Sequence, residues 1–378
     1  MKETIDIYDA RVAAGFIGAW YGQFGRIDEY LRKAKLDEMK DYIHALPGFS
    51  MSDKIFKNFD MTPEEMDISL VEMNSNEFHL LLNMVTSHAI EKSIPGRLMN
   101  VVVWENKTNT ILGFIRLGSP VINLKPRNEW LGQPLDSKNK AMMARFNDSS
   151  IMGFIIVPVQ PFGYNCLGGK LLAGLCCSHE IRQMWMDKYG GEICHFETTS
   201  LYGSTKSVSQ YDGMKPYLRY KGITESDFLP MMVGNGWSQI HKMMRKAYGD
   251  ELAPKNATSR KMKIQAKIFS LISNTLLSEG AAGEYESFKE VLEDAKSLTE
   301  KKRVYFSDYG FSNTREYLNL ETDTLEKKEN FARHSMENVI EWWSGKAMKR
   351  FHSLRQEGRY RTKLELWNKN PDEIDIIR

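Results

Sequence analysis

Two side chains at the end of a β-prone segment have the residue types and spacing for acid–base chemistry. His195 and Glu197 lie in the stretch HFETT, which ends the segment 193–199. Side chains alternate along a strand, so both residues are expected on one face of a sheet. A carboxylate at the carboxyl end of a strand faces the crevice in which α/β proteins bind ligands, where Glu197 would be the general base for an amine or water. A structural pairing of Glu197 with Arg127 is the alternative.

A glycine-containing turn predicts a site for an anion. Segment 151–159 (IMGFIIVPV) is apolar on both faces, as expected of a central strand, and residues 170–188 have the periodicity of a helix. The turn between them holds Gly163, Gly168 and Gly169. The first turn of a helix has unpaired N–H groups and the positive end of the helix dipole, which suit a pyrophosphate or another anion. An ordinary strand–helix connection whose glycines allow close packing is the alternative.

Basic residues interleaved with aromatic residues gather near the C-terminal end. Residues 346–363 (KAMKRFHSLRQEGRYRTK) hold seven Lys/Arg and one Glu, and a second basic run, 255–267, has no acidic residue. Lysines and arginines neutralise phosphates, and aromatic rings between them stack on exposed bases. A solvated helix face is the alternative. We predict contacts with DNA or RNA from the following basic residues: Arg260, Lys261, Lys263, Lys349, Arg350, Arg355, Arg359 and Arg361.

Trp130, Arg127 and His88 are further candidates for binding or catalysis, and each also has a structural alternative. Trp130 is an aromatic residue in a polar loop beside Arg127, which suits stacking on a base or anchoring of the loop on a sheet. We include both residues among the predicted nucleic-acid contacts. His88 is a catalytic candidate, although a lone histidine is more often structural. His179 falls on an apolar helix stripe and is expected in the core.

Changes in residue composition and hydrophobic pattern along the chain predict the helices and strands that must position these residues. Segments 98–104 and 110–117 are β-prone runs separated by a polar turn, which predicts a hairpin. We expect a helical region at 1–62, an α/β (α+β) core at 63–240 and a basic, mainly helical region at 241–378.

Composition places the chain among ordinary globular proteins. It has 378 residues and a net charge of +2, and it contains no apolar run long enough to span a membrane. No signal-like N-terminal pattern is present, so the sequence predicts a cytoplasmic protein that does not bind membranes. The four cysteines lack the spacing of a zinc site and are expected to be reduced core residues, and no metal site is predicted.

The order hairpin, central strand, glycine turn, helix and strand resembles the GNAT (acetyltransferase-like) superfamily. Gln160 and Gly163 match that family's Q/R-x-x-G-x-G/A turn, and Asn165 stands where a second Gly or Ala is expected. A shifted alignment places Asn165-Cys166-Leu167-Gly168 on the turn instead, with Cys166 in place of a Gly. The resemblance implies a mixed sheet flanked by helices and a tyrosine, here Tyr211, Tyr217 or Tyr220, that protonates the departing thiolate. It also implies that acetyl-CoA or another acyl donor is held by the strand end and turn, at Val157, Val159, Gln160, Gly163, Asn165, Gly168 and Gly169.

Residues 86–212 resemble the DruA family of Druantia anti-phage systems. The most specific part is Gly118-Ser119-Pro120 with the run PRNEWLG at 126–132. The rest of the resemblance, which includes Tyr189-Gly190 before the segment 193–199, is the order of the elements. A more distant resemblance is to Mom-type phage proteins, which are GNAT-like enzymes that modify adenine in DNA. These resemblances imply a role in conflict between phage, host and mobile DNA.

Together these patterns favour a transferase-like, acyltransferase-type enzyme that acts on or at nucleic acid, with modification of a base as one form of that activity. The imperfect glycine turn favours a second hypothesis, a non-catalytic nucleic-acid-binding defence or phage scaffold on a degenerate GNAT fold. A third hypothesis is an acetyltransferase for a protein or a small amine. Fold alone does not separate the three.

Overall fold

The structure is a computed structural model, and it describes most of the chain. The described residues are 3–25, 27–42, 52–87, 96–136, 138–200, 209–224, 229–232, 234–255, 261–296, 298 and 301–367. Two predicted site residues, His88 and Arg260, lie outside the described residues.

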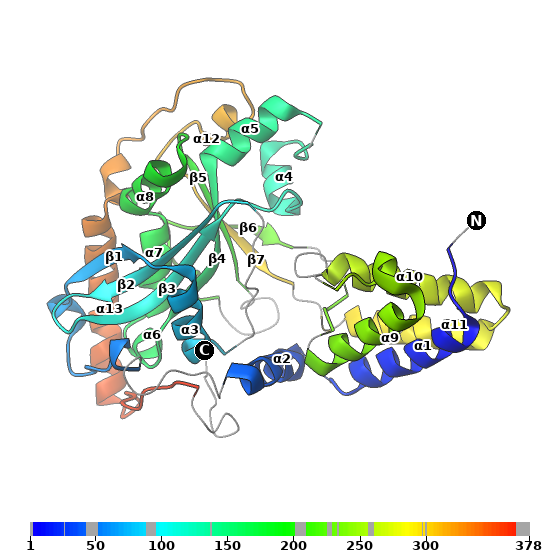
Figure 1. Ribbon diagram of the computed structural model, residues 1–378. Helices are drawn as coiled ribbons and strands as arrows, with labels where there is room; N and C mark the ends of the chain where they lie inside the picture. Colours follow the sequence, from blue (N-terminus) through cyan, green and yellow to red (C-terminus); the bar gives the residue numbers. More distant parts are fainter. Residues whose placement is uncertain are drawn as a thin grey trace. The chain divides into compact units, whose positions relative to one another are not determined.

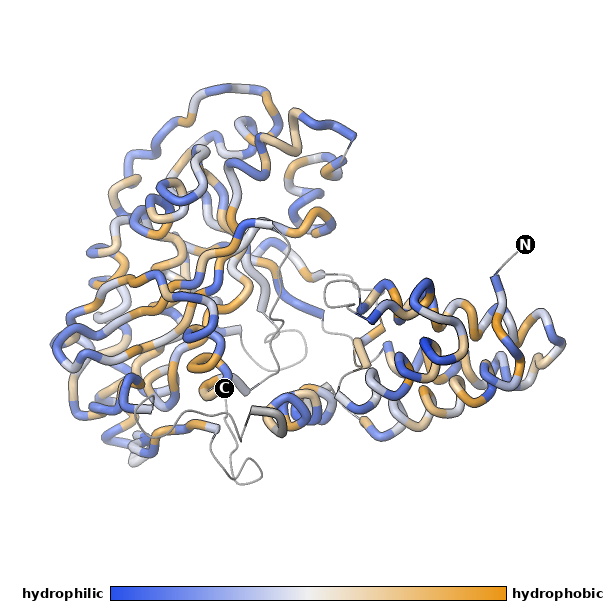
Figure 2. The backbone as a smooth tube through the Cα atoms, viewed as in Figure 1, coloured by the Kyte–Doolittle hydropathy of each residue, from blue (hydrophilic) through white to orange (hydrophobic). Residues whose placement is uncertain are grey.

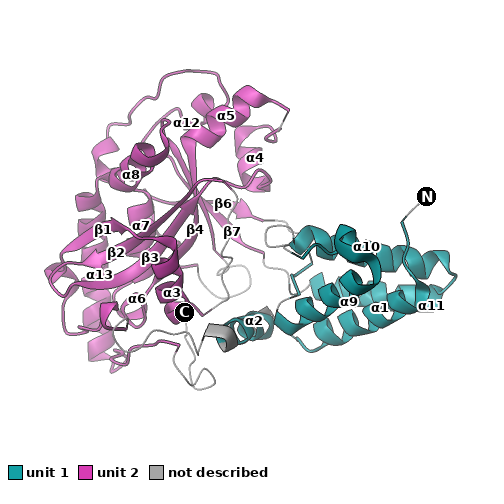
Figure 3. Cartoon of the chain, in the orientation of Figure 1, with its two compact units in different colours: residues 1–45, 88–93, 226–300 teal, residues 46–87, 94–225, 301–378 magenta. Residues whose placement is uncertain are grey.

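The chain forms two compact units, each built from separated segments (Figure 3). Unit 1 comprises residues 1–45, 88–93 and 226–300, and unit 2 comprises 46–87, 94–225 and 301–378. The compact units interleave along the chain. The three consecutive regions expected from the sequence, 1–62, 63–240 and 241–378, stay a prediction about domains.

Unit 1 is helical, as the periodicity of its segments indicates. Its helices are α1 (Ile7–Gly22), α2 (Ile27–Tyr42), α9 (Gly234–Leu252), α10 (Lys261–Ser278) and α11 (Ala282–Lys296). Helix α1 begins at Asp6, whose side chain accepts hydrogen bonds from the N–H groups of Tyr8 and Asp9. Helix α10 buries the predicted apolar stripe, which includes Ile264, Ile268 and Ile272.

Unit 2 contains a mixed seven-stranded sheet with the order β1-β2-β3-β4-β5-β7-β6 (Figure 1). The strands are β1 (Ile68–Glu72), β2 (Leu98–Glu105), β3 (Thr110–Gly118), β4 (Ser150–Pro158), β5 (His195–Ser200), β6 (Arg219–Ile223) and β7 (Arg303–Ser307). Strands β4 and β5 pair in parallel, and the other pairs are antiparallel. The α+β fold class, the hairpin β2–β3 and the central strand β4 are therefore confirmed.

Helices cover both faces of this sheet. On one face, Phe78 of α3 (Ser75–Val85) packs on Phe114, and α4 (Lys125–Leu131) and α5 (Lys140–Ser149) follow along the sheet. On the other face lie α6 (Phe162–Asn165), α7 (Gly168–Cys176) and α8 (His179–Tyr189), and α13 (Met336–Gln356) packs on the outer side of α7. Short elements complete the unit: α12 (Thr314–Leu318), η1 (Ser52–Lys54), η2 (Pro63–Glu65) and η3 (Phe331–His334). The strands between these layers are mostly apolar (Figure 2).

The prediction of one helix over 170–188 is wrong, because the segment forms two helices. Helix α7 ends at Cys177, which has non-helical backbone angles (φ −96°, ψ 9°). The side chain of Ser178 then accepts a hydrogen bond from the N–H of Ile181 and starts α8. A serine hydroxyl inside the apparent stripe is thus the signal of a new helix start.

All four cysteines are buried and free, as expected. Within the described ranges, no helix is both long and apolar enough to cross a bilayer. The same residues contain no group of three His, Cys, Asp or Glu side chains arranged to hold a metal ion.

The turn before β5 has a glycine that no other residue can replace without a cost. Gly191 has φ +87°, and a Cβ there would lie 2.2 Å from the backbone oxygen of Asp148. Gly213 also has a positive φ, +72°, but a Cβ there meets no atom within 4 Å. We expect Gly213→Ala to lower the free energy of unfolding by about 1–2 kcal/mol through backbone strain alone, and Gly191→Ala by roughly 1–3 kcal/mol more. Chemical denaturation of both variants checks this, and equal losses would contradict the clash.

Candidate functional site

A buried ion pair lies between β5 and α4. Period-two alternation places His195 and Glu197 on the face of the sheet that α4 covers. The Nη1 of Arg127 donates to Oε1 of Glu197 at 2.9 Å, and both side chains have no exposed surface. The same guanidinium donates to the carbonyl oxygens of Val121, at 2.9 Å, and Ile122. Arg127 therefore ties the loop before α4 to the sheet.

The paired Glu197 carboxylate has little capacity left for base catalysis. Its Oε1 accepts from Arg127, and its Oε2 lies 3.3 Å from Nε2 of His195. Burial lowers the pKa of the Arg127 guanidinium, and the adjacent Glu197 opposes that shift. The pairing named above as the structural alternative is present, and the catalytic roles of His195 and Glu197 stay predictions.

Aromatic rings enclose the imidazole of His195. The Trp130 ring stacks on it, with centroids 5.3 Å apart and planes 17° apart, and Phe306 of β7 contacts it edge-on at 4.8 Å. The Nζ of Lys221 lies 5.6 Å from the centroid of the Trp130 ring. The expectation that Trp130 lies in a polar loop is wrong, because the residue is half-buried in helix α4 and anchors this helix on the sheet. Phe306 and Lys221 complete the cluster, and no motif around them pointed to it.

The predicted catalytic tyrosines lie on the opposite face of the sheet. The ring of Tyr211 packs edge-on against Tyr305, which pairs in register with Thr198 and so shares its face. Tyr217 donates from its hydroxyl to a backbone carbonyl oxygen, and burial raises its pKa to about 12. The sheet thus separates both tyrosines from Glu197, and the structure does not bring the predicted catalytic residues to one place. Tyr220, the third candidate, is half-exposed on edge strand β6.

The glycine turn after β4 is packed by side chains. A Cβ on Gly163 would lie 2.7 Å from Nε2 of Gln160, and one on Gly168 would lie 2.6 Å from the Phe162 ring. At Gly169 the nearest atom is Oε1 of Gln210, 2.3 Å from a Cβ position. The glycines therefore allow close packing, and a pyrophosphate at the start of α7 fits only after Gln210 moves away.

The remaining predicted cofactor residues are also engaged within the protein. Val157 and Val159 are buried in and beside β4. The Asn165 side chain donates to the carbonyl oxygen of Arg361 at 2.7 Å and accepts from its N–H at 3.2 Å. Asn165, which the resemblance to GNAT turns matched to a second Gly or Ala position, thus attaches the C-terminal segment to the turn through its amide.

The C-terminal basic segment packs on this same turn. The Trp343 indole of α13 donates to the carbonyl oxygen of Cys166 at 2.8 Å. The guanidinium groups of Arg350 and Arg361 lie 4.8 and 3.9 Å from the centroid of the Tyr164 ring. We call the basic residues of α13 and the segment after it the Tyr164 patch, which comprises Lys346, Lys349, Arg350, Arg359 and Arg361. Of these, Arg350, Arg359 and Arg361 contact Tyr164, and Lys346 and Lys349 precede Arg350 on α13.

Ion pairs divide the basic residues of this segment into two groups. Three arginines each contact a carboxylate: Arg355 contacts Asp60 at 2.8 Å, Arg359 contacts Glu357 at 2.6 Å and Arg361 contacts Glu365 at 3.2 Å. Lys346, Lys349 and Arg350 form no ion pair with a carboxylate of the described residues. The second group has the greater capacity for an external anion. Lys261 and Lys263 are exposed at the start of α10 in unit 1.

Comparison with known proteins supports one family. The model of the family described as Druantia protein DruA matches residues 25–259, which is more than half of the chain. The chain belongs to the DruA family. A curated relative, Druantia protein DruA of Escherichia coli (strain UMEA 4076-1), is 22% identical over 239 residues. That alignment covers 53% of this chain and 54% of the relative, so the chain spans about half the length of the curated relative that it matches. No solved structure matches the chain.

The DruA match includes one of the two groups of candidate residues and not the other. The Arg127–Glu197 pair and the glycine turn lie inside the matched range, whereas α13 and the Tyr164 patch lie after residue 259. The DruA resemblance noted in the sequence is confirmed.

Proposed function

We propose that this DruA-family chain is a nucleic-acid-binding protein of phage defence. The family supports the defence role, and the surface of unit 2 supports the choice of partner. One observation carries the proposal: the basic C-terminal segment and the glycine turn, predicted separately as anion sites, lie together around Tyr164.

The chemistry of this patch suits a phosphodiester chain. Lys346 lies close enough to Lys170 of α7 to lower its pKa, although burial is the larger cause. Cations from α7 and α13 therefore act on the same region. Phosphates would neutralise this charge and release counterions, which gives an affinity that falls steeply with salt. The planar guanidinium groups of Arg350 and Arg361, held over the Tyr164 ring, would add a surface on which a base stacks.

A GNAT-like transferase is the second candidate, and the pairing of β4 with β5 favours it. The two parallel strands pair over only four residues, from Ser150 with His195 to Gly153 with Thr198, although β4 continues to Pro158. The end of β4 is thus free of β5 beside the start of α7. An acyl donor would place its pyrophosphate at the N–H groups of Gly168 and Gly169, beside the Lys170 ammonium.

We rank binding above transfer because of two contacts. Gln210 covers Gly169, and Arg127 holds the Glu197 carboxylate that would act as base. The acyl donor would supply an activated acyl group, but this chain has its candidate base and its candidate acid on opposite faces of the sheet.

An acyl donor is expected to leave the stability of the protein unchanged. We expect millimolar acetyl-CoA to give no rise in melting temperature, because Gln210 occupies the space beside the first turn of α7. A ligand at tenfold its Kd would stabilise by about 1.4 kcal/mol, equivalent to a rise of roughly 2–4 °C. Such a rise in a thermal scan would move the transferase to first place. If the rise disappears when the reference sample contains free coenzyme A, the coenzyme part of the donor is what binds.

Two measurements test the proposed function itself. Fluorescence anisotropy with labelled single-stranded and duplex DNA and RNA should show binding at low salt, and absence of binding to all of them would sink the proposal. Mass spectrometry of nucleosides from cells with and without the chain separates the two candidates. Unchanged nucleosides agree with binding alone, and a new modified base would establish the transferase.

A further inference from the structure

A concave site lies in unit 2, and neither the Arg127–Glu197 pair nor the Tyr164 patch lines it. It is a cavity of about 640 Å³ between α8 and the segment 311–331. Its volume falls in the range of small-molecule sites, roughly 300–1,000 Å³. The lining residues that carry the argument are His179, Arg182, Phe311, Asp323, Lys327 and Phe331.

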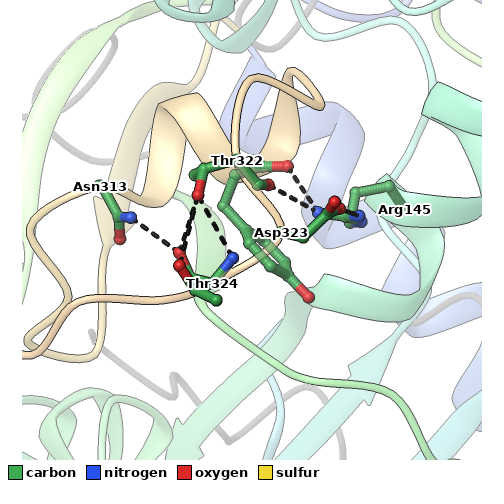
Figure 4. A network of polar contacts seen from close by, with 6 residues as sticks. Arg145, Asn313, Thr322, Asp323 and Thr324 are labelled. Atoms are coloured by element: carbon green, nitrogen blue, oxygen red, sulfur yellow. Dashed lines mark hydrogen bonds and ion pairs between the residues drawn. The ribbon is translucent and has the colours of Figure 1, made fainter.

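One wall of this cavity is held in place by a dense polar network (Figure 4). The Nη1 of Arg145 donates to the carbonyl oxygens of Tyr317 and Thr322 at 3.1 and 3.2 Å, and its Nη2 donates to Asp323 at 2.6 Å. The Asn313 side chain donates to the carbonyl oxygen of Thr324 at 2.8 Å. These bonds fix the loop before a ligand arrives, which lowers the entropy that binding costs.

Aromatic rings form another part of the cavity lining. His179 stacks on Phe331, with centroids 4.1 Å apart and planes 27° apart, and Phe311 lies 5.1 Å from Phe331. Rings grouped in this way favour a flat, unsaturated ligand. The expectation that His179 lies in the core is wrong, because His179 is the half-buried first residue of α8 and lines the cavity.

The imidazole of His179 offers an unused acceptor. Its Nε2 lies 3.0 Å from the carbonyl oxygen of Phe331, which only accepts, so Nε2 carries the proton. Burial lowers the pKa of His179, which keeps the ring neutral near pH 7. Nδ1 is then an acceptor that is buried from solvent, and it has no hydrogen-bond partner within the described residues.

The charges around the cavity leave one cation in excess. The Glu192 carboxylate is paired with Arg182, and Asp323 with Arg145. Lys327 has no ion pair with a carboxylate of the described part of the chain, and its Nζ lies 4.7 Å from the Phe331 ring. Asp323 keeps most of its carboxylate exposed, at 90%, and can accept further hydrogen bonds. The cavity thus combines rings, one free positive charge and several acceptors.

We propose that this cavity binds a small nucleotide. The base would lie against the half-buried ring of Phe331, and the phosphate would meet Lys327. Base amino groups and sugar hydroxyls would donate to Asp323 and, after a small shift, to Nδ1 of His179. A nucleotide is the common ligand class that carries all three features together.

Calorimetric titration of the full chain with AMP, adenosine and inorganic phosphate tests the proposal. We expect saturable AMP binding, at least tenfold weaker binding of adenosine and no detectable binding of phosphate alone. Lys327→Ala should weaken AMP at least tenfold. Lys328→Ala is the matched control, because Lys328 pairs with Asp308 and does not line the cavity. It should leave AMP binding unchanged.

Two outcomes would overturn the nucleotide site. One is a flat titration with millimolar AMP, and the other is an equal effect of the two lysine variants. Since Lys327 is exposed, its loss should not impair folding, which circular dichroism would verify. Binding of labelled DNA by Lys327→Ala should equal that of the unmodified chain, so failure here leaves the Tyr164 patch untouched.

Discussion

Arg127→Ala is expected to lower the stability of unit 2 by about 3–5 kcal/mol. The substitution leaves the Glu197 carboxylate charged and fully buried without its main partner, and the solvation that it lost on folding is no longer compensated. It also removes the donors to Val121 and Ile122, so the loop before α4 loses its attachment. Urea denaturation followed by tryptophan fluorescence measures the loss, because Trp130 lies beside the pair.

A double variant distinguishes an ion pair from simple packing. Arg127→Met combined with Glu197→Leu replaces both charges by apolar groups of similar volume, a change that is often neutral or stabilising. We therefore expect the double variant to be more stable than Arg127→Ala. If it is equally damaged, the residues matter through shape and not through charge. Glu197→Gln tests the catalytic hypothesis separately, since loss of a modified base with retained folding would restore Glu197 as a base.

Removing three cations of the Tyr164 patch should have the second large effect. The variant Lys346→Ala, Lys349→Ala, Arg350→Ala deletes the charges that form no ion pair within the described chain. Each lost phosphate contact lowers the salt slope of log K by about 1, so the slope should fall by roughly 2–3. At 0.1 M salt the affinity for DNA should drop on the order of 100-fold. Anisotropy titrations at several salt concentrations give both quantities.

The paired arginines provide the matched control for that variant. Replacing Arg355, Arg359 and Arg361 by alanine removes the same formal charge, but each of these side chains already contacts a carboxylate. The loss should reduce affinity and the salt slope less than the first variant does. Equal losses would show that the ion pairs open on binding, and unchanged binding in both variants would make the segment a solvated face.

The proposed roles fall on surfaces and not in the crevice of the sheet. In a sheet where β4 leaves β5 after four residue pairs, the region beside Pro158 is where an α/β protein is expected to hold its ligand. Here Gln210 and the C-terminal segment already contact that region. Because Gln210 and the C-terminal segment cover the region beside Pro158, a nucleic acid would bind to the basic residues on the outer surface of that segment.

Local periodicity determined which elements form and which residues share a face. The alternation HFETT placed His195 and Glu197 together, and the apolar stripe of 264–272 placed α10 on its core. These features depend on residues within a few positions of one another, so the sequence by itself specifies them. It failed at Ser178, where one hydrogen bond from the N–H of Ile181 decides between continuing a helix and starting another.

Only the tertiary structure determined which side chains pair with one another. Arg127 meets Glu197 across 70 positions of the chain, and Asn165 meets Arg361 across 196. The sequence offered a glycine turn and a basic segment as two sites, and packing of α13 on α7 joined them around Tyr164. Side chains distant in sequence gain energy only after the sheet and helices have brought them together, so no local pattern records which of them will pair.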